Sequence, residues 1–574
     1  MITKIETSWN ENFQNDGALY FFQRIVEMLE FNTIDIYQCP IMNTHRLIIE
    51  YVSSCKNGVK SFHLNDIYDE FLQSFQTDVA IIHGLGEEKL GEIVDKLKSS
   101  PNNRMEIMDY LLHSVGNNYM LWIKSYILEI VPLNKNKKKI EKAVRCLLPE
   151  LFLCGYSRNE IYYSAKTILL SASYDNNKLK KFLKSFNRKE KTFSVYLAIN
   201  EDLMKFKSIL ADHLELSFDD DGNFSKFENW DNFFIVKMSS VKALDAGVAA
   251  YKAYNNISLF TSFYQFFDNY SDVLVSPKTV VTANGIDWRT VYVNYGKFKI
   301  KRSDDQAFSG QLSESFINSL TDHARCSLST IRKILKLHNR AISNNGQENG
   351  FLNFWSILEL VCVKNESSKL NQVKSIVVPI LQYDYLVNLF SDLEENLKSI
   401  LSEDDYNNLC DAVTTTDPNY LKIANIVLLD EYYEKLDSLV DSLIDYPVIR
   451  SRLLELHDNY KSTNTLFNMS ARYAKRVDWH LSRIYRARNS IVHSGTSPVN
   501  LNELGIHLHS YVDSLVNEVI FKLSTSSFCH VSNVLIDSEL KHDRIFRLLK
   551  ENRPFDYDII KKTLCDNDNY CPNS

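Results

Sequence analysis

Three polar side chains near the carboxyl end of the chain have the chemistry needed to act on a phosphodiester. Arg488 and Asn489 are adjacent, and His493 follows after three further residues. A guanidinium is a planar, permanently charged donor to phosphate oxygens, and an imidazole titrates near neutral pH and can transfer a proton. Asn489 stands four residues before His493, so both would share one helix face. We therefore predict a catalytic site formed by Arg488, Asn489 and His493 that uses no metal.

A long amphipathic helix is expected to carry these residues. Apolar side chains precede the site at helical spacing and place Arg488 on their own stripe: Val477, Leu481 and Ile484. Gly495 is expected to end the helix, which leaves His493 in the last turn, where the helix dipole favours a protonated imidazole. A guanidinium on a core stripe must be paired or must bind an anion.

A second helix is predicted to supply the partner of Arg488. Residues 351–363 are apolar almost throughout, so we expect a buried central helix that contains Glu359. A carboxylate in such a helix needs a counter-charge, and Arg488 is the other charged residue on an apolar stripe. The burial logic predicts an ion pair between Glu359 and Arg488.

The charge of the chain limits how it can bind nucleic acid. The formal net charge is −7, which argues against broad nonspecific binding. Any contact with RNA must then use a local basic patch. The candidate patch lies on the helix that carries the site, with Arg483 and Arg486 as the supporting residues nearest to it, and its members are Arg472, Lys475, Arg476, Arg483 and Arg486.

Two segments resemble the HEPN superfamily (higher eukaryotes and prokaryotes nucleotide-binding), in particular the ApeA-like branch of bacterial anti-phage proteins. They are residues 488–495, RNSIVHSG, and residues 351–359, FLNFWSILE. The resemblance covers roughly residues 313–523. It implies a helical bundle that acts as an endoribonuclease, with Arg488 and His493 in the catalytic site. It further implies a homodimer with a shared cleft and a role in abortive infection, in which host or phage RNA is cleaved.

Other interpretations of the same residues stay open. An Arg followed by a His at similar spacing recurs at Arg332/His338 and Arg452/His457, but neither pair has the following Asn or the terminal Ser-Gly. The stretch around Arg332 also carries lysines and is interpreted as a solvated helix face. In the alternative function, the chain is a non-catalytic HEPN protein that binds a nucleotide or RNA, and Arg488 holds an anion.

Composition predicts a mainly α protein of the ordinary globular kind. Gly and Pro are few, at 16 and 11 residues, and no run of eighteen apolar residues or signal peptide is apparent. We therefore expect a cytoplasmic protein without a membrane partner. The ten cysteines lack a Cys-x-x-Cys pair, so buried thiols are expected, with no metal and no cofactor.

Changes of periodicity suggest four segments. Residues 1–194 are predicted to be a mostly helical domain and 195–305 a small α/β domain with a hairpin at Asn284-Gly285. Residues 306–545 form the HEPN-like helical domain, with a helical insertion near 385–446, and 546–574 a polar tail. The first half is expected to sense a phage-derived molecule or a nucleotide.

Weaker candidates are assigned structural roles. Residues 217–228 nearly fit a calcium loop, but an Asp-rich turn between strands fits better. Residues 79–86 resemble a strand and glycine loop, yet the following glutamates would repel phosphate, so a plain turn is favoured. The basic stretch 178–191 has aromatic residues at core spacing. His507 and His509 are taken to have no acidic or cysteine companion at ligand spacing, so both are interpreted as surface or packing residues.

Overall fold

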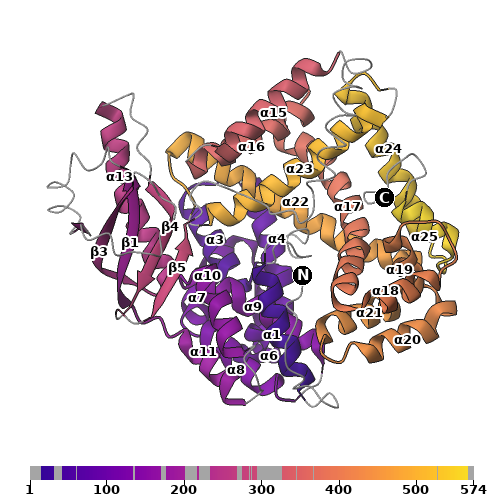
Figure 1. Ribbon diagram of the computed structural model, residues 1–574, viewed down its shortest axis with the longest axis horizontal. Helices are drawn as coiled ribbons and strands as arrows, with labels where there is room; N and C mark the ends of the chain where they lie inside the picture. Colours follow the sequence, from indigo (N-terminus) through magenta and orange to yellow (C-terminus); the bar gives the residue numbers. More distant parts are fainter. Residues whose placement is uncertain are drawn as a thin grey trace. The chain divides into compact units, whose positions relative to one another are not determined.

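The computed structural model (Figure 1) shows a mainly helical protein with one small antiparallel sheet, as predicted. It describes residues 15–30, 42–59, 61–133, 136–169, 176–200, 216–218, 233–267, 275–283, 285, 287–293, 326–343, 346–365, 368–498, 500–525 and 528–565. The chain forms two compact units, one of Met1–Cys146 with Gly296–Ser574 and one of Leu147–Tyr295. Residues 1–146 thus belong with the C-terminal helices, while the predicted domain boundaries stay predictions. Residues 294–325, which include the predicted boundary between 305 and 306, lie outside the described residues.

The first part of the larger unit consists of short helices. They are α1 (Asp16–Leu29), α3 (Thr44–Lys56), α4 (Ser61–Thr77), α5 (Val79–Leu85), α6 (Glu87–Ser99), α7 (Arg104–Gly116), α8 (Tyr119–Ile130) and α9 (Lys137–Leu153), with a 3-10 turn at Pro101–Asn103. The residues of α9 from Leu147 onward belong to the smaller unit. Asp78 caps α5 by accepting from two backbone N–H groups, which explains why 79–85 is helical and not the strand considered for a phosphate loop. Gly86 ends the helix with φ of 80° and makes the turn into α6.

The second part of the larger unit contains longer helices. They are α15 (Leu328–Ser343), α16 (Gln347–Cys362), α17 (Lys369–Ile400), α18 (Glu403–Asp411), α19 (Asn419–Leu428), α20 (Tyr433–Ser442), α21 (Pro447–Asn459), α22 (Thr463–Ser494), α23 (Leu501–Thr525), α24 (Val531–Lys550) and α25 (Tyr557–Leu564). The predicted insertion near 385–446 is helical, although α17 runs unbroken through residue 385. The segment expected to be a polar tail contains α25, whose Ile559, Ile560 and Leu564 are buried.

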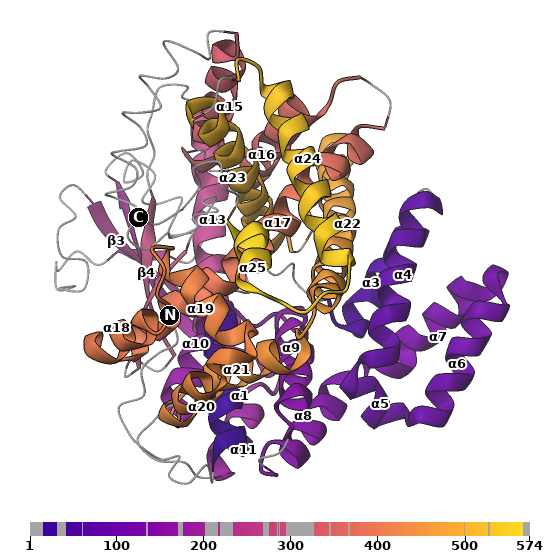
Figure 2. The ribbon, with the colours of Figure 1, turned by 90° about the vertical axis from the view of Figure 1, so that its right-hand side faces the viewer.

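Helix α16 lies at the centre of one bundle in this part. It contacts α15, α17, α22 and α23, which run beside one another in Figure 2. The side chains of Phe351, Phe354 and Trp355 are at most 1% exposed, so the predicted buried helix at 351–363 is confirmed. Burial on most sides follows from a sequence that is apolar almost all round.

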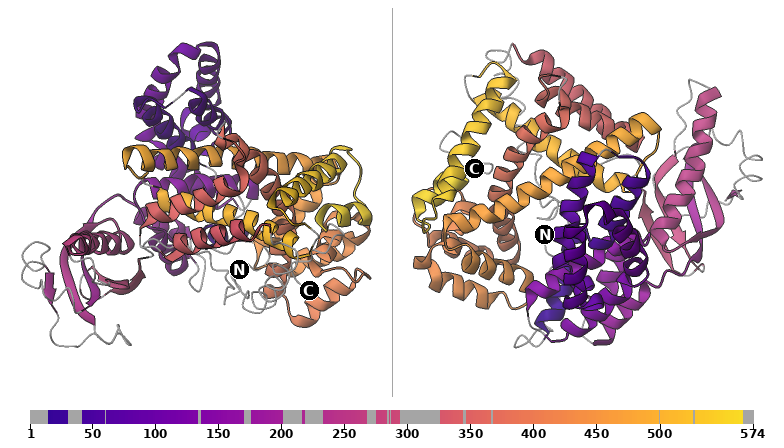
Figure 3. Two further views of the ribbon diagram at one scale, coloured as in Figure 1. Left: turned by 90° about the horizontal axis from the view of Figure 1, so that it is seen from above. Right: turned by 180° about the vertical axis from the view of Figure 1, so that it is seen from behind.

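The smaller unit is built on a five-stranded antiparallel sheet in the order β2-β3-β1-β4-β5. Its strands are β1 (Lys191–Asn200), β2 (Leu216–Phe218), β3 (Phe233–Ala243), β4 (Val275–Thr282) and β5 (Trp288–Tyr292). Helix α13 (Ala246–Phe267) covers one face (Figure 3), where Val195, Leu197 and Ile199 alternate inward against small residues such as Ala249 and Ala253. A small sheet with a helix on one face is therefore present, while the predicted α/β domain of residues 195–305 stays a prediction.

Several local predictions can be checked in the smaller unit. Its remaining helices are α10 (Arg158–Ser164), a π turn at Ala165–Leu169, and α11 (Asn176–Ser185). The predicted hairpin joins β4 to β5, with Gly285 at φ of 72°. Leu179, Phe182, Leu183 and Phe186 are buried, so the basic stretch does have a core face. Ser217 lies in strand β2, whereas residues 219–228 of the acidic turn lie outside the described part.

None of the helices among the described residues combines the length and the apolar content that a membrane span requires.

Candidate active site

Helix α22 positions the predicted catalytic residues. It begins with a capping box in which Ser462 and Thr465 bond each other's backbone, and it ends at Gly495, whose φ of 61° only glycine adopts without strain. Val477, Leu481 and Ile484 are 0% exposed, which confirms the predicted apolar stripe. Arg488 continues that stripe at the point where the helix emerges from the core.

The predicted pairing of Arg488 with Glu359 is present. Nη2 of Arg488 lies 3.8 Å from Oε1 of Glu359 on α16, and the two side chains are 24% and 20% exposed. Glu359 also accepts a hydrogen bond of 2.7 Å from the indole Nε1 of Trp355 and lies 3.7 Å from Nζ of Lys369. The guanidinium is therefore oriented by a carboxylate and still reaches solvent, so it is less buried than the stripe alone predicts.

Asn489 lies between the arginine and the histidine. Its Oδ1 accepts a hydrogen bond of 3.2 Å from Nη1 of Arg488. His493 is exposed in the last turn of α22, about 140° around the helix from Arg488 but only about 40° from Asn489. Arg488 and His493 thus flank the helix end from two sides, with the amide between them. A substrate phosphate must lie over the end of the helix to meet both.

A basic groove adjoins Glu359. It has a volume of about 590 Å³ and is lined by α15, α16 and the start of α17. Its charged lining residues are the cations Lys333, Lys336, Arg340 and Lys369 and the single carboxylate of Glu359. Because Glu359 also holds Arg488, the groove leads to the candidate site. Because its lining has four cations and a single carboxylate, the groove is a suitable surface for binding an anion such as an RNA phosphate.

The sequence interpretation missed this groove. It assigned the lysine-bearing stretch near Arg332 to a solvated helix face. The signal was nevertheless present, because Lys333, Lys336 and Arg340 are spaced i, i+3, i+7 and share one side of α15. The sequence alone does not show that this side of α15 lies against α16 and the start of α17.

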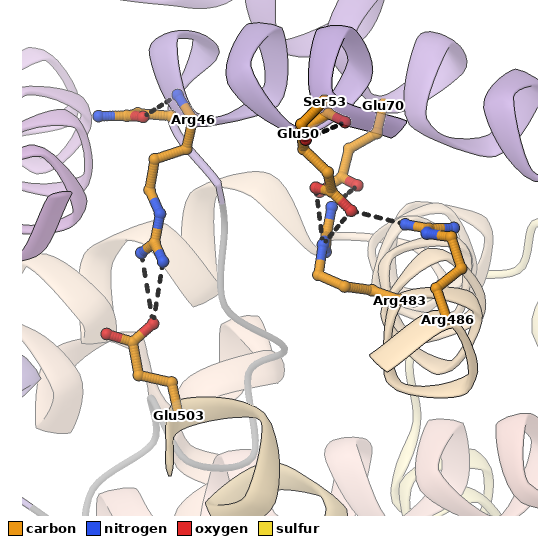
Figure 4. Close-up of polar contacts among 8 residues, drawn as sticks. Arg46, Glu50, Ser53, Glu70, Arg483, Arg486 and Glu503 are labelled. Atoms are coloured by element: carbon orange, nitrogen blue, oxygen red, sulfur yellow. Dashed lines mark hydrogen bonds and ion pairs between the residues drawn. The ribbon is translucent and has the colours of Figure 1, made fainter. Parts of the chain in front are cut away.

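Arg483 and Arg486 occupy a different environment from the one predicted. Figure 4 shows both guanidiniums directed at carboxylates of α3 and α4. Arg483 is 5% exposed, and its Nε and Nη2 lie 2.9 Å and 2.6 Å from Glu50 and Glu70. Arg486 donates to Glu50 at 2.6 Å. These two residues therefore hold helices together and are not part of an RNA-facing patch, which leaves Arg472, Lys475 and Arg476 of the predicted set.

The pKa values in this cluster reflect burial and charge together. Burial alone would raise the pKa of Glu50, but the guanidiniums of Arg483 and Arg486 outweigh it and hold that pKa below its ordinary value. Burial raises the pKa of Glu70, and the single close guanidinium of Arg483 only partly offsets it. The two carboxylates raise the pKa of Arg483 against the effect of its burial, so this arginine is charged at any accessible pH.

The other Arg and His pairs lie in structural contacts. Arg452 forms an ion pair of 2.6 Å with Glu27, and the buried His457 is bonded through Nδ1 to the carbonyl of Val427. His338 contacts Asp513 and His509. The interpretation of His509 as a residue without an acidic companion is wrong, because Asp513 stands one helical turn further on α23 and lies 3.4 Å from its Nε2.

A comparison with protein-family models, with curated proteins and with solved structures finds no match to this chain. The chemistry of the site must therefore be argued from its own geometry. That geometry offers a permanently charged guanidinium, an amide and an exposed imidazole at one helix end, with a basic groove beside them. Such a set can bind an anion and transfer protons at a phosphodiester.

Proposed function

We propose that this protein is a metal-independent endoribonuclease of the HEPN type, with the bundle of α16, α17, α22 and α23 as its HEPN core. The observation that carries the proposal is the position of Arg488. Glu359 and Asn489 hold its guanidinium at the surface, next to a groove that presents four cations. The exposed His493 ends the same helix. Arg488, Asn489 and His493 are the proposed catalytic residues, and Glu359 orients the arginine.

The proposed reaction uses the nucleophile that RNA itself carries. The 2′-oxygen attacks the adjacent phosphorus and loses its proton to an imidazole, the bond from phosphorus to the 5′-oxygen breaks, and that oxygen takes up a proton. Arg488 stabilises the extra negative charge on the phosphorane. The products are a 2′,3′-cyclic phosphate and a 5′-hydroxyl end. The proposed reaction requires no metal ion and no cofactor.

The active unit is proposed to be a homodimer. One imidazole cannot at the same moment accept the proton of the 2′-OH and donate one to the leaving 5′-oxygen. Two copies of His493 around one cleft supply both, and a two-fold interface is the common way to bring two copies together. We propose that this interface runs along α16 and α22. The side chain of Val492, beside His493, is 47% exposed and would be covered by such an interface.

The remainder of the chain is proposed to regulate the nuclease in an anti-phage, abortive-infection role in the cytoplasm. A phage-derived molecule or a nucleotide bound within residues 1–305 is the proposed trigger. A physical route exists in the larger unit, because α3 and α4 contact α22 through Glu50 and Glu70 (Figure 4). Arg46 of α3 also lies 3.3 Å from Glu503 of α23. A movement of α3 would thus act on both helices, α22 and α23, that flank the connection at residues 495–500.

A non-catalytic HEPN protein that binds a nucleotide or RNA is the second candidate. The contacts of Arg488 with Glu359 and Asn489 favour it, since an arginine that is already held can bind an anion without taking part in a reaction. The two candidates differ in one outcome. A binding protein retains end-labelled RNA intact, whereas the nuclease converts it to products.

The test is incubation of purified protein with end-labelled RNA and an RNA ladder. Wild type is compared with Arg488→Ala, Asn489→Ala and His493→Ala. Matched controls are Arg547→Ala, an exposed arginine on α24, and His113→Ala, an exposed histidine on α7. Cleavage by wild type and both controls but not by the His493 and Arg488 variants supports the nuclease. Intact RNA that is nevertheless bound supports the second candidate.

A further inference from the structure

Two histidines and an aspartate from separate helices converge on one point in the larger unit. His338 lies on α15, and His509 and Asp513 lie one turn apart on α23. Nε2 of His338 is 3.2 Å from Nε2 of His509 and 3.1 Å from Oδ1 of Asp513. Nε2 of His509 is 3.4 Å from the same oxygen. Among the described residues, these three form the single group of His, Cys and carboxylate side chains close enough to share an ion.

The triangle of ligand atoms has the dimensions of one face of a metal coordination shell. Zinc bound by imidazole nitrogen at about 2.0 to 2.1 Å in a tetrahedral site separates its ligand atoms by about 3.3 to 3.4 Å. The three observed edges are 3.2, 3.1 and 3.4 Å. A hydrogen-bonded cluster has edges of similar length, because one ring N–H can donate to the other ring nitrogen at 3.2 Å. The titration described below distinguishes a shared cation from a shared hydrogen.

The surrounding side chains hold the rings in this orientation. The ring of Phe354 on α16 stacks on His509, with centroids 4.4 Å apart and planes at 21°, and meets the ring of His338 edge-on at 5.6 Å. The side chain of His509 is 7% exposed, whereas that of His338 is 27% exposed. The ligand set is therefore fixed from the core side and remains accessible past His338.

We propose that His338, His509 and Asp513 bind one divalent transition-metal ion, with Zn²⁺ as the best fit. Two imidazoles and one carboxylate suit Zn²⁺ and Fe²⁺, while Mg²⁺ and Ca²⁺ prefer oxygen ligands alone. Three protein ligands leave at least one coordination position for water or a substrate atom. The bound ion joins α15 to α23, and α15 carries three of the four cations of the basic groove.

This site is separate from the proposed nuclease site and does not depend on it. Arg488, Asn489 and His493 transfer protons and stabilise charge without an ion, so the metal site is tested by binding and not by RNA cleavage. Failure of one proposal leaves the other standing.

The experiment is a calorimetric titration of chelator-treated, dialysed full-length protein with Zn²⁺, repeated with Fe²⁺ under anaerobic conditions and with Mg²⁺. We expect one Zn²⁺ per chain and a melting temperature that rises with Zn²⁺ concentration. His338→Gln and Asp513→Asn keep a polar side chain at partly exposed positions and should weaken binding at least about tenfold. His509→Ala should abolish it. His530→Ala, an exposed histidine outside the cluster, is the matched control.

Circular dichroism of each variant separates loss of the site from loss of the fold. Tight binding of Fe²⁺ in preference to Zn²⁺ supports the same site with a different ion. The proposal is overturned if the folded wild type binds no transition metal, if it binds Mg²⁺ equally well, or if His338→Gln and Asp513→Asn bind Zn²⁺ as wild type does.

Discussion

The middle and the end of helix α22 carry arginines only a few residues apart that have opposite environments. Arg483 is 5% exposed and forms ion pairs with Glu50 and Glu70 at 2.9 and 2.6 Å. Arg488 is 24% exposed and lies 3.8 Å from a carboxylate that already has two other partners. The charge of Arg483 is neutralised by ion pairs within the fold. The charge of Arg488 is oriented but still available to a ligand.

This difference separates a structural arginine from a candidate functional one by a physical criterion. Removing one member of a buried ion pair leaves a desolvated charge without compensation, whereas a partly exposed charge recovers hydration. The comparison therefore predicts that stability depends on the middle of α22 and that activity depends on its end.

The largest expected effect is on stability, at Arg483. Arg483→Ala should lower the free energy of unfolding by about 3 to 5 kcal/mol, because Glu50 and Glu70 stay buried without their shared counter-charge. Arg488→Ala should lower it by about 1 kcal/mol or less, since Glu359 keeps Trp355 and Lys369 as partners. Urea unfolding of both variants measures the difference. Equal losses would show that the two environments are energetically alike.

Activity should show the reverse order. His493→Ala and Arg488→Ala are expected to reduce the rate of RNA cleavage by about 100-fold or more, the usual contribution of a positioned acid or base. The melting temperature of His493→Ala should match wild type because the side chain is exposed. Single-turnover rates on a defined RNA provide the measurement. Wild-type rates in the His493 variant would remove this residue from the mechanism.

The proposed dimer sharpens the comparison further, because it would make activity depend on protein concentration while leaving the ion-pair cluster unaffected. The specific activity should fall on dilution through the dissociation range that light scattering defines. A monomer that retains full specific activity contradicts the two-histidine mechanism.

The acid dependence of stability should report the cluster at the middle of the helix. The pKa of Glu50 is lowered in the folded protein, so its stabilisation is present above about pH 4.5 and is lost as the pH falls through the folded pKa. The pKa of Glu70 is raised, so its contribution to stability increases as the pH falls. Glu50→Gln should therefore flatten the acid loss of stability, and Glu70→Gln should steepen it. Unfolding curves between about pH 7 and about pH 2.5 test the two signs.

The smallest expected effect is at the basic groove. Lys336→Gln should reduce the slope of log Kd for single-stranded RNA against log salt by about 0.7, since one phosphate contact is lost. Lys435→Gln, an exposed lysine on α20 outside the groove, is the matched control. Binding is measured with His493→Ala protein so that the RNA stays intact. An unchanged slope for Lys336→Gln would place the RNA elsewhere.

Local patterns predicted much of this molecule. The stripe of Val477, Leu481 and Ile484 and the stop at Gly495 depend on residues within a few turns of one another, and both are present. The ion pair of Glu359 and Arg488 could also be predicted, because burying either charge without a partner is costly. This argument requires only that both residues lie on apolar helix faces.

The features that the sequence did not predict depend on distant parts of the chain. Arg483 and Glu50 form an ion pair although they are 433 residues apart in the sequence. No local pattern around Arg483 indicates whether it forms a buried ion pair or belongs to a surface patch. The ligand set at His509 is a mixed case. Asp513 at the next helical turn was a visible signal, but His338 arrives from 171 residues away.

The central claim is that Arg488, Asn489 and His493 cleave RNA by 2′-OH attack without a metal ion. The most direct measurement is the end chemistry of the products formed in excess EDTA with no added divalent ion. The account predicts 2′,3′-cyclic phosphate and 5′-hydroxyl ends, formed by wild type and not by His493→Ala. Products with 5′-phosphate ends, or cleavage that occurs only after Mg²⁺ is added, would contradict it.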